Sequence, residues 1–118
     1  MSMDNLIERL RCHPESSRIG MMACHLGVVR GTSLKGFQVQ EIEVIYDQDA
    51  IAKIISETRN MDGIVDVLVE TSEGLLKVGD EILAVAVAGE TRETVFPALI
   101  RTVDRIKAEA VQKREIPL

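Results

Sequence analysis

Positive side chains near residue 110 are the groups in this chain best suited to binding a charged ligand or stabilising a charged intermediate. Lys107, Lys113 and Arg114 gather there, in a stretch whose amphipathic pattern predicts a helix close to its C-terminal end. Cations at that position complement the helix dipole, which is a purely structural explanation. They are equally able to bind an anion. Both explanations stay open at this point.

Two arginines add to the case for an anion site. Arg30 follows the first long predicted strand and precedes a glycine-bounded loop, and Arg92 lies in the first turn of the last predicted helix. A positive side chain opposes the dipole in that turn, so Arg92 has no local stabilising role. An arginine beside free helical amides does form an anion site. A solvated surface charge is the ordinary alternative for each of these cations.

The positions of Arg92 and Lys107 raise a problem of distance. They are fifteen residues apart on one predicted helix. At about 1.5 Å per residue they are separated by about 22 Å, so one small ligand in a single chain cannot contact both. Either the two are unrelated, or two copies of the chain bring opposite helix ends together.

The cysteines and histidines predict no metal site, and no cofactor is expected. Cys12 and Cys24 match no metal-ligand spacing and are expected to be reduced thiols in a cytoplasmic protein. His13 is expected in a turn and His25 in or at the end of a strand, each without a Cys, Asp or Glu at ligand spacing. The chain also lacks a G-x-S-x-G nucleophile setting, a P-loop and a dinucleotide fingerprint.

Composition limits the classes of partner. A length of 118 residues predicts a single domain over residues 1–118, and 46% hydrophobic residues with only 3% aromatics predict an aliphatic core. The net charge of −5 disfavours binding to a nucleic-acid backbone, and the few aromatics disfavour base stacking. No apolar run reaches the roughly 18 residues of a membrane span. The first eleven residues do not resemble a signal peptide.

The hydrophobic periodicity predicts an α+β fold with helices packed on one side of a mixed sheet. The strand over 37–46 is expected to bulge or change facing midway, and the strand over 81–88 to be buried on both faces. The expected elements are a short helix capped by Asp4, strands over 18–29 and 37–46, a helix over 47–61, a strand over 64–69, a short extended piece at 75–76, a strand over 81–88 and a last helix whose first turn contains Arg92.

Six short stretches carry a resemblance to a known family. They are LGVVR (26–30), AIAKIISE (50–57), GDEI (79–82), GETR (89–92), DRIK (104–107) and KRE (113–115). In order and spacing, over roughly residues 18–115, the chain resembles the catalytic (large) subunit of molybdopterin synthase. The resemblance implies an α/β hammerhead type of fold, in agreement with the α+β prediction.

The resemblance also implies an activity and its partners. Enzymes of that family are sulfurtransferases that convert cyclic pyranopterin monophosphate into the dithiolene molybdopterin. The sulfur arrives as a thiocarboxylate on the C-terminal glycine of a small ubiquitin-like subunit, whose tail threads into a pocket of the large subunit. The large subunits form a homodimer and each binds one small subunit, which gives a heterotetramer.

Site residues follow from the same resemblance. Lys107 and Lys113 are implied to be catalytic, with Lys107 polarising the thiocarboxylate carbonyl, holding a covalent linkage to the tail or acting as a base. A base would need burial beside Lys113 to lower its pKa. The implied substrate-binding set is Arg30, Thr91, Arg92, Lys107, Lys113, Arg114 and Glu115.

Two other functions stay open from the sequence. A diverged binding module would keep the fold and the groove for the small partner but lack turnover. Thr91 and the pair Thr71–Ser72, which stand where the family has histidines, favour that alternative. The third possibility is an unrelated α+β regulator.

Overall fold

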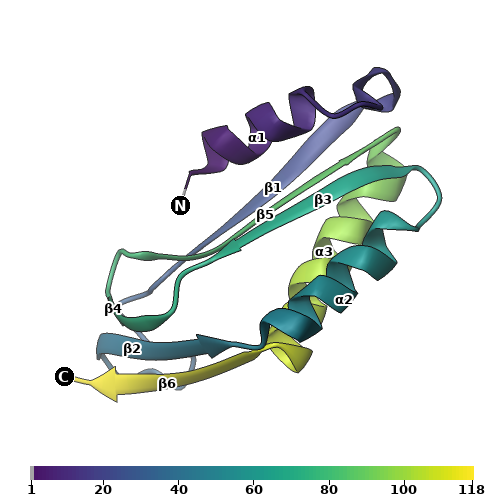
Figure 1. Ribbon diagram of the computed structural model, residues 1–118. Helices are drawn as coiled ribbons and strands as arrows, with labels where there is room; N and C mark the ends of the chain where they lie inside the picture. Colours follow the sequence, from purple (N-terminus) through teal and green to yellow (C-terminus); the bar gives the residue numbers. More distant parts are fainter. Residues whose placement is uncertain (1) are drawn as a thin grey trace.

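The computed structural model describes residues 2–118 as two antiparallel three-stranded sheets and three α-helices (Figure 1). The elements are α1 (Met3–Arg11), a 3₁₀ turn (Ser16–Arg18), β1 (Met21–Val28), β2 (Val39–Tyr46), α2 (Gln48–Arg59), β3 (Ile64–Thr71), β4 (Gly74–Lys77), β5 (Glu81–Gly89), α3 (Arg92–Glu109) and β6 (Val111–Pro117). The first sheet has the strand order β1-β5-β3 and the second β4-β2-β6. Helix α1 lies on one face of the first sheet, and α2 and α3 lie on the other (Figure 1).

Strand β5 separates two hydrophobic clusters. Every residue from 83 to 89 is buried, as the nearly continuous apolar run predicts. Side chains alternate between the faces of a strand, so the large residues Leu83, Val85 and Val87 join the core beneath α2 and α3. Alanines at 84, 86 and 88 face α1. Their small size lets the helix approach the sheet closely.

The second sheet is joined to the first through Tyr46. Its hydroxyl donates a hydrogen bond to the carbonyl oxygen of Ile82 on β5, at 3.1 Å. Burial, followed by the negative charge of Glu73, raises the pKa of Tyr46 to about 12, so the hydroxyl keeps its proton. A register shift between Val39 and Glu41 confirms the expected irregularity in this strand.

The α+β class is confirmed, and several details of the sequence expectation are corrected. Helices cover both faces of the first sheet and not one side of it. Every strand pair is antiparallel, so two antiparallel sheets replace the single mixed sheet. Ser2, and not Asp4, caps α1, because its hydroxyl accepts the amide hydrogen of Asn5 at 3.2 Å. Strand β1 begins at Met21, since the residues before it form the 3₁₀ turn in which Arg18 pairs with a nearby glutamate.

The largest correction concerns the segment from 107 to 115, which the amphipathic pattern predicts to be a helix end. Helix α3 stops at Glu109, and after Ala110 the chain enters β6. Strand β6 pairs with β2 along its whole length, with Lys113 opposite Val44. Hydrogen bonding to an open strand edge outweighs a weak helical preference. The dipole explanation therefore holds for Lys107 alone, which is the only cation in the last turn of α3.

None of the helices described within residues 2–118 combines the length and the apolar character that crossing a lipid bilayer requires.

The packing of α1 on the alanine row can be tested with Leu6→Ala. Leu6 is fully buried against that row, and its truncation leaves a cavity, so the free energy of unfolding should fall by about 2–5 kcal/mol. Urea unfolding measures the change. Asn5→Ala on the exposed side of the same helix should stay within about 0.5 kcal/mol of the parent. Equal stability of the two variants would contradict the described packing.

Candidate active site

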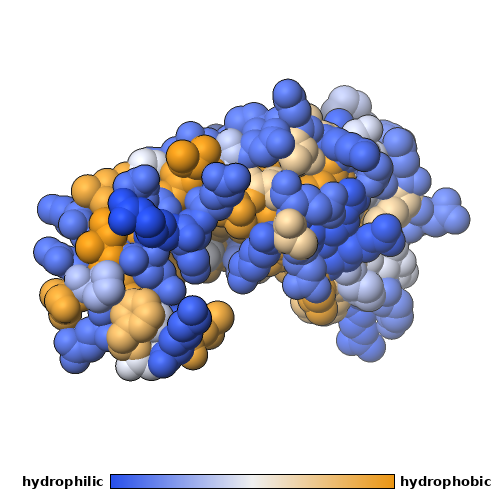
Figure 2. Space-filling model, turned by 90° about the horizontal axis from the view of Figure 1, so that it is seen from below, coloured by the Kyte–Doolittle hydropathy of each residue, from blue (hydrophilic) through white to orange (hydrophobic). Residues whose placement is uncertain are grey.

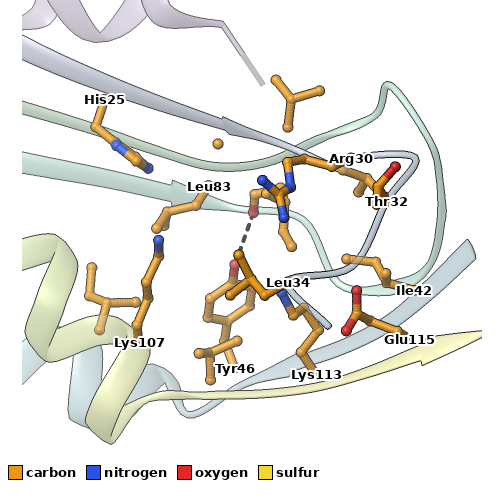
Figure 3. A pocket seen from close by; sticks show the side chains of 16 residues that line it. His25, Arg30, Thr32, Leu34, Ile42, Tyr46, Leu83, Lys107, Lys113 and Glu115 are labelled. Carbon is orange, nitrogen blue, oxygen red and sulfur yellow. Dashed lines mark hydrogen bonds between the residues drawn. The ribbon is translucent and has the colours of Figure 1, made fainter. Parts of the chain in front are cut away.

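A cavity of about 580 Å³ lies where the two sheets meet the C-terminal end of α3 (Figure 3). Its apolar walls include Ile42 and Tyr46 from β2, Leu83 from β5 and Ile106 from α3. Clefts of a few hundred cubic ångströms with apolar walls and a few polar groups are typical of small-molecule sites.

Three cations line this cavity. Arg30 comes from the loop after β1, Lys107 from the last turn of α3 and Lys113 from β6. Only Ala110 separates α3 from β6, so the tight junction brings both lysines to one cavity. Among the residues that the structure describes, none of the three forms an ion pair with a carboxylate. Glu115 also lines the cavity, as its one acidic side chain.

The three cations that line the cavity reach solvent. Arg30, Lys107 and Lys113 are all exposed, so the burial that a lysine base would need is absent at Lys107. Leu34, in the loop between β1 and β2, is 92% exposed and belongs to the cavity lining. Figure 2 shows other hydrophobic side chains reaching the surface at the end of the molecule that the second sheet forms. A ligand with both anionic and apolar parts would match this combination.

His25 is the cavity residue that sequence reasoning missed. It lies on β1, and Figure 3 shows its imidazole beside the space into which Lys107 extends. Partial burial, and then the positive charge of Lys107, lower its pKa below the ordinary value of about 6.5. The ring is therefore neutral at pH 7. The sequence feature that could have revealed its facing is the two-residue period of a strand, which puts His25 on the same face as Ala23 and Gly27.

Three residues of the expected site lie elsewhere. Thr91 and Arg92 are at the N-terminal end of α3, far from Lys107 along the helix, as the spacing predicts. Arg92 is largely exposed and pairs with Glu93 at 3.5 Å. Arg114 is left out of the cavity lining because neighbouring side chains on β6 alternate between faces, and it pairs with Glu43 at 3.0 Å. One chain therefore assembles Arg30, Lys107, Lys113 and Glu115, without the other three.

The remaining reactive groups form no second centre within the described part of the chain. Cys12 and Cys24 are both free and exposed. The sulfur of Cys24 is nevertheless partly desolvated, and this raises the pKa of its thiol. No group of three or more His, Cys, Asp or Glu side chains in residues 2–118 is arranged to hold a metal ion. The cavity is thus the candidate active site of the described part of the chain.

Comparison with known proteins identifies relatives of the whole chain. A curated protein of Methanocaldococcus jannaschii, itself uncharacterised, is 28% identical over 109 residues, covering 89% of this chain and 87% of its own. The structure of molybdopterin cofactor biosynthesis protein E from Burkholderia multivorans is 27% identical, with a TM-score of 0.78 over 99% of this chain and 84% of that one.

A third comparison shares the fold at lower identity. It is a protein–protein complex of subunits 1 and 2 of the molybdopterin-converting factor from Helicobacter pylori. The matched chain is 13% identical, with a TM-score of 0.75 over 99% of this chain and 80% of that one. The model of the family described as "MoaE protein" matches residues 1–109. The chain therefore belongs to the MoaE protein family.

Proposed function

We propose that the protein transfers sulfur from the thiocarboxylated tail of a small ubiquitin-like subunit to cyclic pyranopterin monophosphate, and that the transfer takes place in the cavity. As a MoaE protein, the chain is a catalytic subunit of molybdopterin synthase, a sulfur-transferring enzyme of molybdenum cofactor biosynthesis. The observation that carries the proposal is the convergence of Arg30, Lys107 and Lys113 on one cavity with apolar walls.

Charge supports the assignment of the substrate. A cyclic phosphate is a compact anion, and arginine and lysine bind such groups through charge-assisted hydrogen bonds. Arg30 and Lys113 have no carboxylate partner within residues 2–118, so an anion can take that place. We assign the phosphate or the pterin oxygens to these two side chains, with the apolar walls excluding water around the ring system.

Lys107 is assigned to the chemical step as a fixed positive charge. It is exposed and lines the cavity, so it is suited to an electrostatic role rather than to that of a buried base. An ammonium group beside the thiocarboxylate carbonyl stabilises the negative charge that develops on its oxygen. Glu115 and Arg114, which are adjacent residues of β6, are assigned to holding that strand and the tail in place.

The partner protein is inferred from two features. The Helicobacter pylori relative was solved as a complex of two subunits of the converting factor, and we extend such an assembly to this chain. The exposed Leu34 beside the cavity offers an apolar contact for an incoming tail. In this proposal the tail enters from the solvent side, past Leu34, and reaches Lys107.

A homodimer would resolve the separation of Arg92 from Lys107. In the proposed assembly, Arg92 and Thr91 of one protomer complete the cavity of the other, and each protomer carries one small subunit. Arg92 is exposed, and within residues 2–118 it pairs only with its sequence neighbour Glu93, so it is available for this contact.

Lys107→Ala tests the chemical assignment. Purified protein is mixed with thiocarboxylated small subunit and pyranopterin monophosphate, and the dithiolene product is measured. Loss of a charge that acts in the transition state should lower the rate by about 100-fold or more. Lys53→Ala makes the same change on α2, outside the cavity, and should keep the parental rate. A Lys107→Ala protein that works at the parental rate would overturn the assignment.

Mixed dimers test the shared site. Lys107→Ala and Arg92→Ala should each be inactive, but an equimolar mixture, allowed to exchange subunits, should recover activity. If each site combines Lys107 of one protomer with Arg92 of the other, about one quarter of the sites in the mixture are intact, by two-fold symmetry. Failure of the mixture to regain activity, or a monomer in sedimentation, would rule out sharing.

A further inference from the structure

The imidazole of His25 has a glycine, Gly27, as its neighbour on the same face of β1, and both residues line the cavity. A β-carbon added to Gly27, the next residue on the same face of β1, would lie 3.4 Å from Nε2 of His25 and 3.1 Å from Cγ2 of Ile82. A side chain at position 27 would press on Ile82, and its β-carbon would lie in van der Waals contact with the ring of His25. The absence of one leaves the Nε2 edge of His25 open toward the cavity (Figure 3).

The ring nitrogens of His25 form no hydrogen bond or ion pair with any residue from 2 to 118. His13 differs, since its Nε2 lies 3.3 Å from Asp66. A half-buried imidazole without a partner is available to a ligand or to water. The titratable and charged groups that share the cavity with it, one element at a time, are Arg30 after β1, Tyr46 on β2, Lys107 on α3, and Lys113 and Glu115 on β6.

Sulfur transfer from a thiocarboxylate requires a group that moves protons. When the thiocarboxylate sulfur displaces an oxygen substituent from a substrate carbon, a C–S bond replaces a C–O bond, and the tail and the substrate are joined as a thioester, R–CO–S–R′. Water must then add to the acyl carbon, the C–S bond breaks, and the products are R–COOH and R′–SH. One proton leaves the attacking water and one reaches the departing sulfur, so a single group that accepts and then returns a proton balances the step.

We propose that His25 is this group: its imidazole takes a proton from the water that attacks the acyl carbon and returns it to the departing sulfur. The inference rests on the proposed sulfur transfer. The pKa of His25, lowered by burial and by Lys107, keeps the ring in the unprotonated form that can accept a proton at pH 7.

The other candidates in the cavity are less suited. The Tyr46 hydroxyl donates to the Ile82 carbonyl, and its pKa of about 12 keeps it protonated. Lys107 is exposed and lacks the burial that would make it a base. Glu115 lies on β6, and in Figure 3 it is on the side of the cavity away from Lys107. His25 faces Lys107, so the base and the charge that stabilises the oxyanion act on one acyl group.

His25→Gln tests the proposal, because glutamine keeps polarity and approximate size but cannot exchange a proton near neutral pH. The single-turnover rate at pH 7.5 should fall by about 100-fold or more. The parental rate should decline as the pH falls through the His25 pKa, below about 6.5, and this acid limb should vanish in the variant. Mass spectrometry should show the tail–substrate thioester accumulating, and binding of the small subunit should be unchanged.

His13→Gln is the matched control, since it removes the other histidine of the chain, which lies outside the cavity. Circular dichroism establishes that both variants are folded, and added imidazole should partly restore a His25→Ala variant. A His25→Gln protein with the parental rate and an intact acid limb would overturn the inference and leave the proposed function standing. If the parent protein itself forms no dithiolene product, the proposed function fails as well.

Discussion

The burial of β5 on both faces is the constraint on which the other elements depend. Its large residues hold α2 and α3 on one face, and its alanines receive α1 on the other. The same strand carries the Ile82 carbonyl that accepts the Tyr46 hydroxyl, and so fixes the second sheet against the first. A strand without solvent on either side has one register that buries all its apolar side chains. That register also fixes the cavity walls that β5 forms directly and those on β2 that it holds through Tyr46.

Local pattern was sufficient for most of the fold. The apolar run of β5 and the apolar stripe of α2 each contain enough information to be assigned alone, because burial on two faces or on one helical face leaves a distinct period. The segment around Lys113 cannot be assigned from its own sequence pattern. Its alternation suits a helix end and a strand almost equally, and the decision comes from the free edge of β2, more than sixty residues earlier in the chain. Pairing between distant segments is not visible in a local period.

The site residues also divide into those that the sequence predicts and those that only the folded structure reveals. Arg30, Lys107 and Lys113 were identified through their order in the chain, and the structure brings them to one cavity. The resemblance also implies Arg114, as the middle residue of the 113–115 stretch, although adjacent residues on a strand face opposite ways. His25 was passed over because an isolated histidine has no motif. Its environment consists of Gly27 beside it, Lys107 from a helix eighty residues later and the second sheet below, and only the folded chain brings these together.

The attachment of α1 has a consequence for how the molecule opens. Leu6, Leu10 and the alanine row form a cluster that shares no buried residue with the core around the cavity. Segments with a separate and small set of buried contacts open with a lower free energy than the whole domain. The amide hydrogens of α1 should therefore exchange with solvent ahead of those in α2, α3 and β5. The N-terminal helix is in this sense a separate foldon.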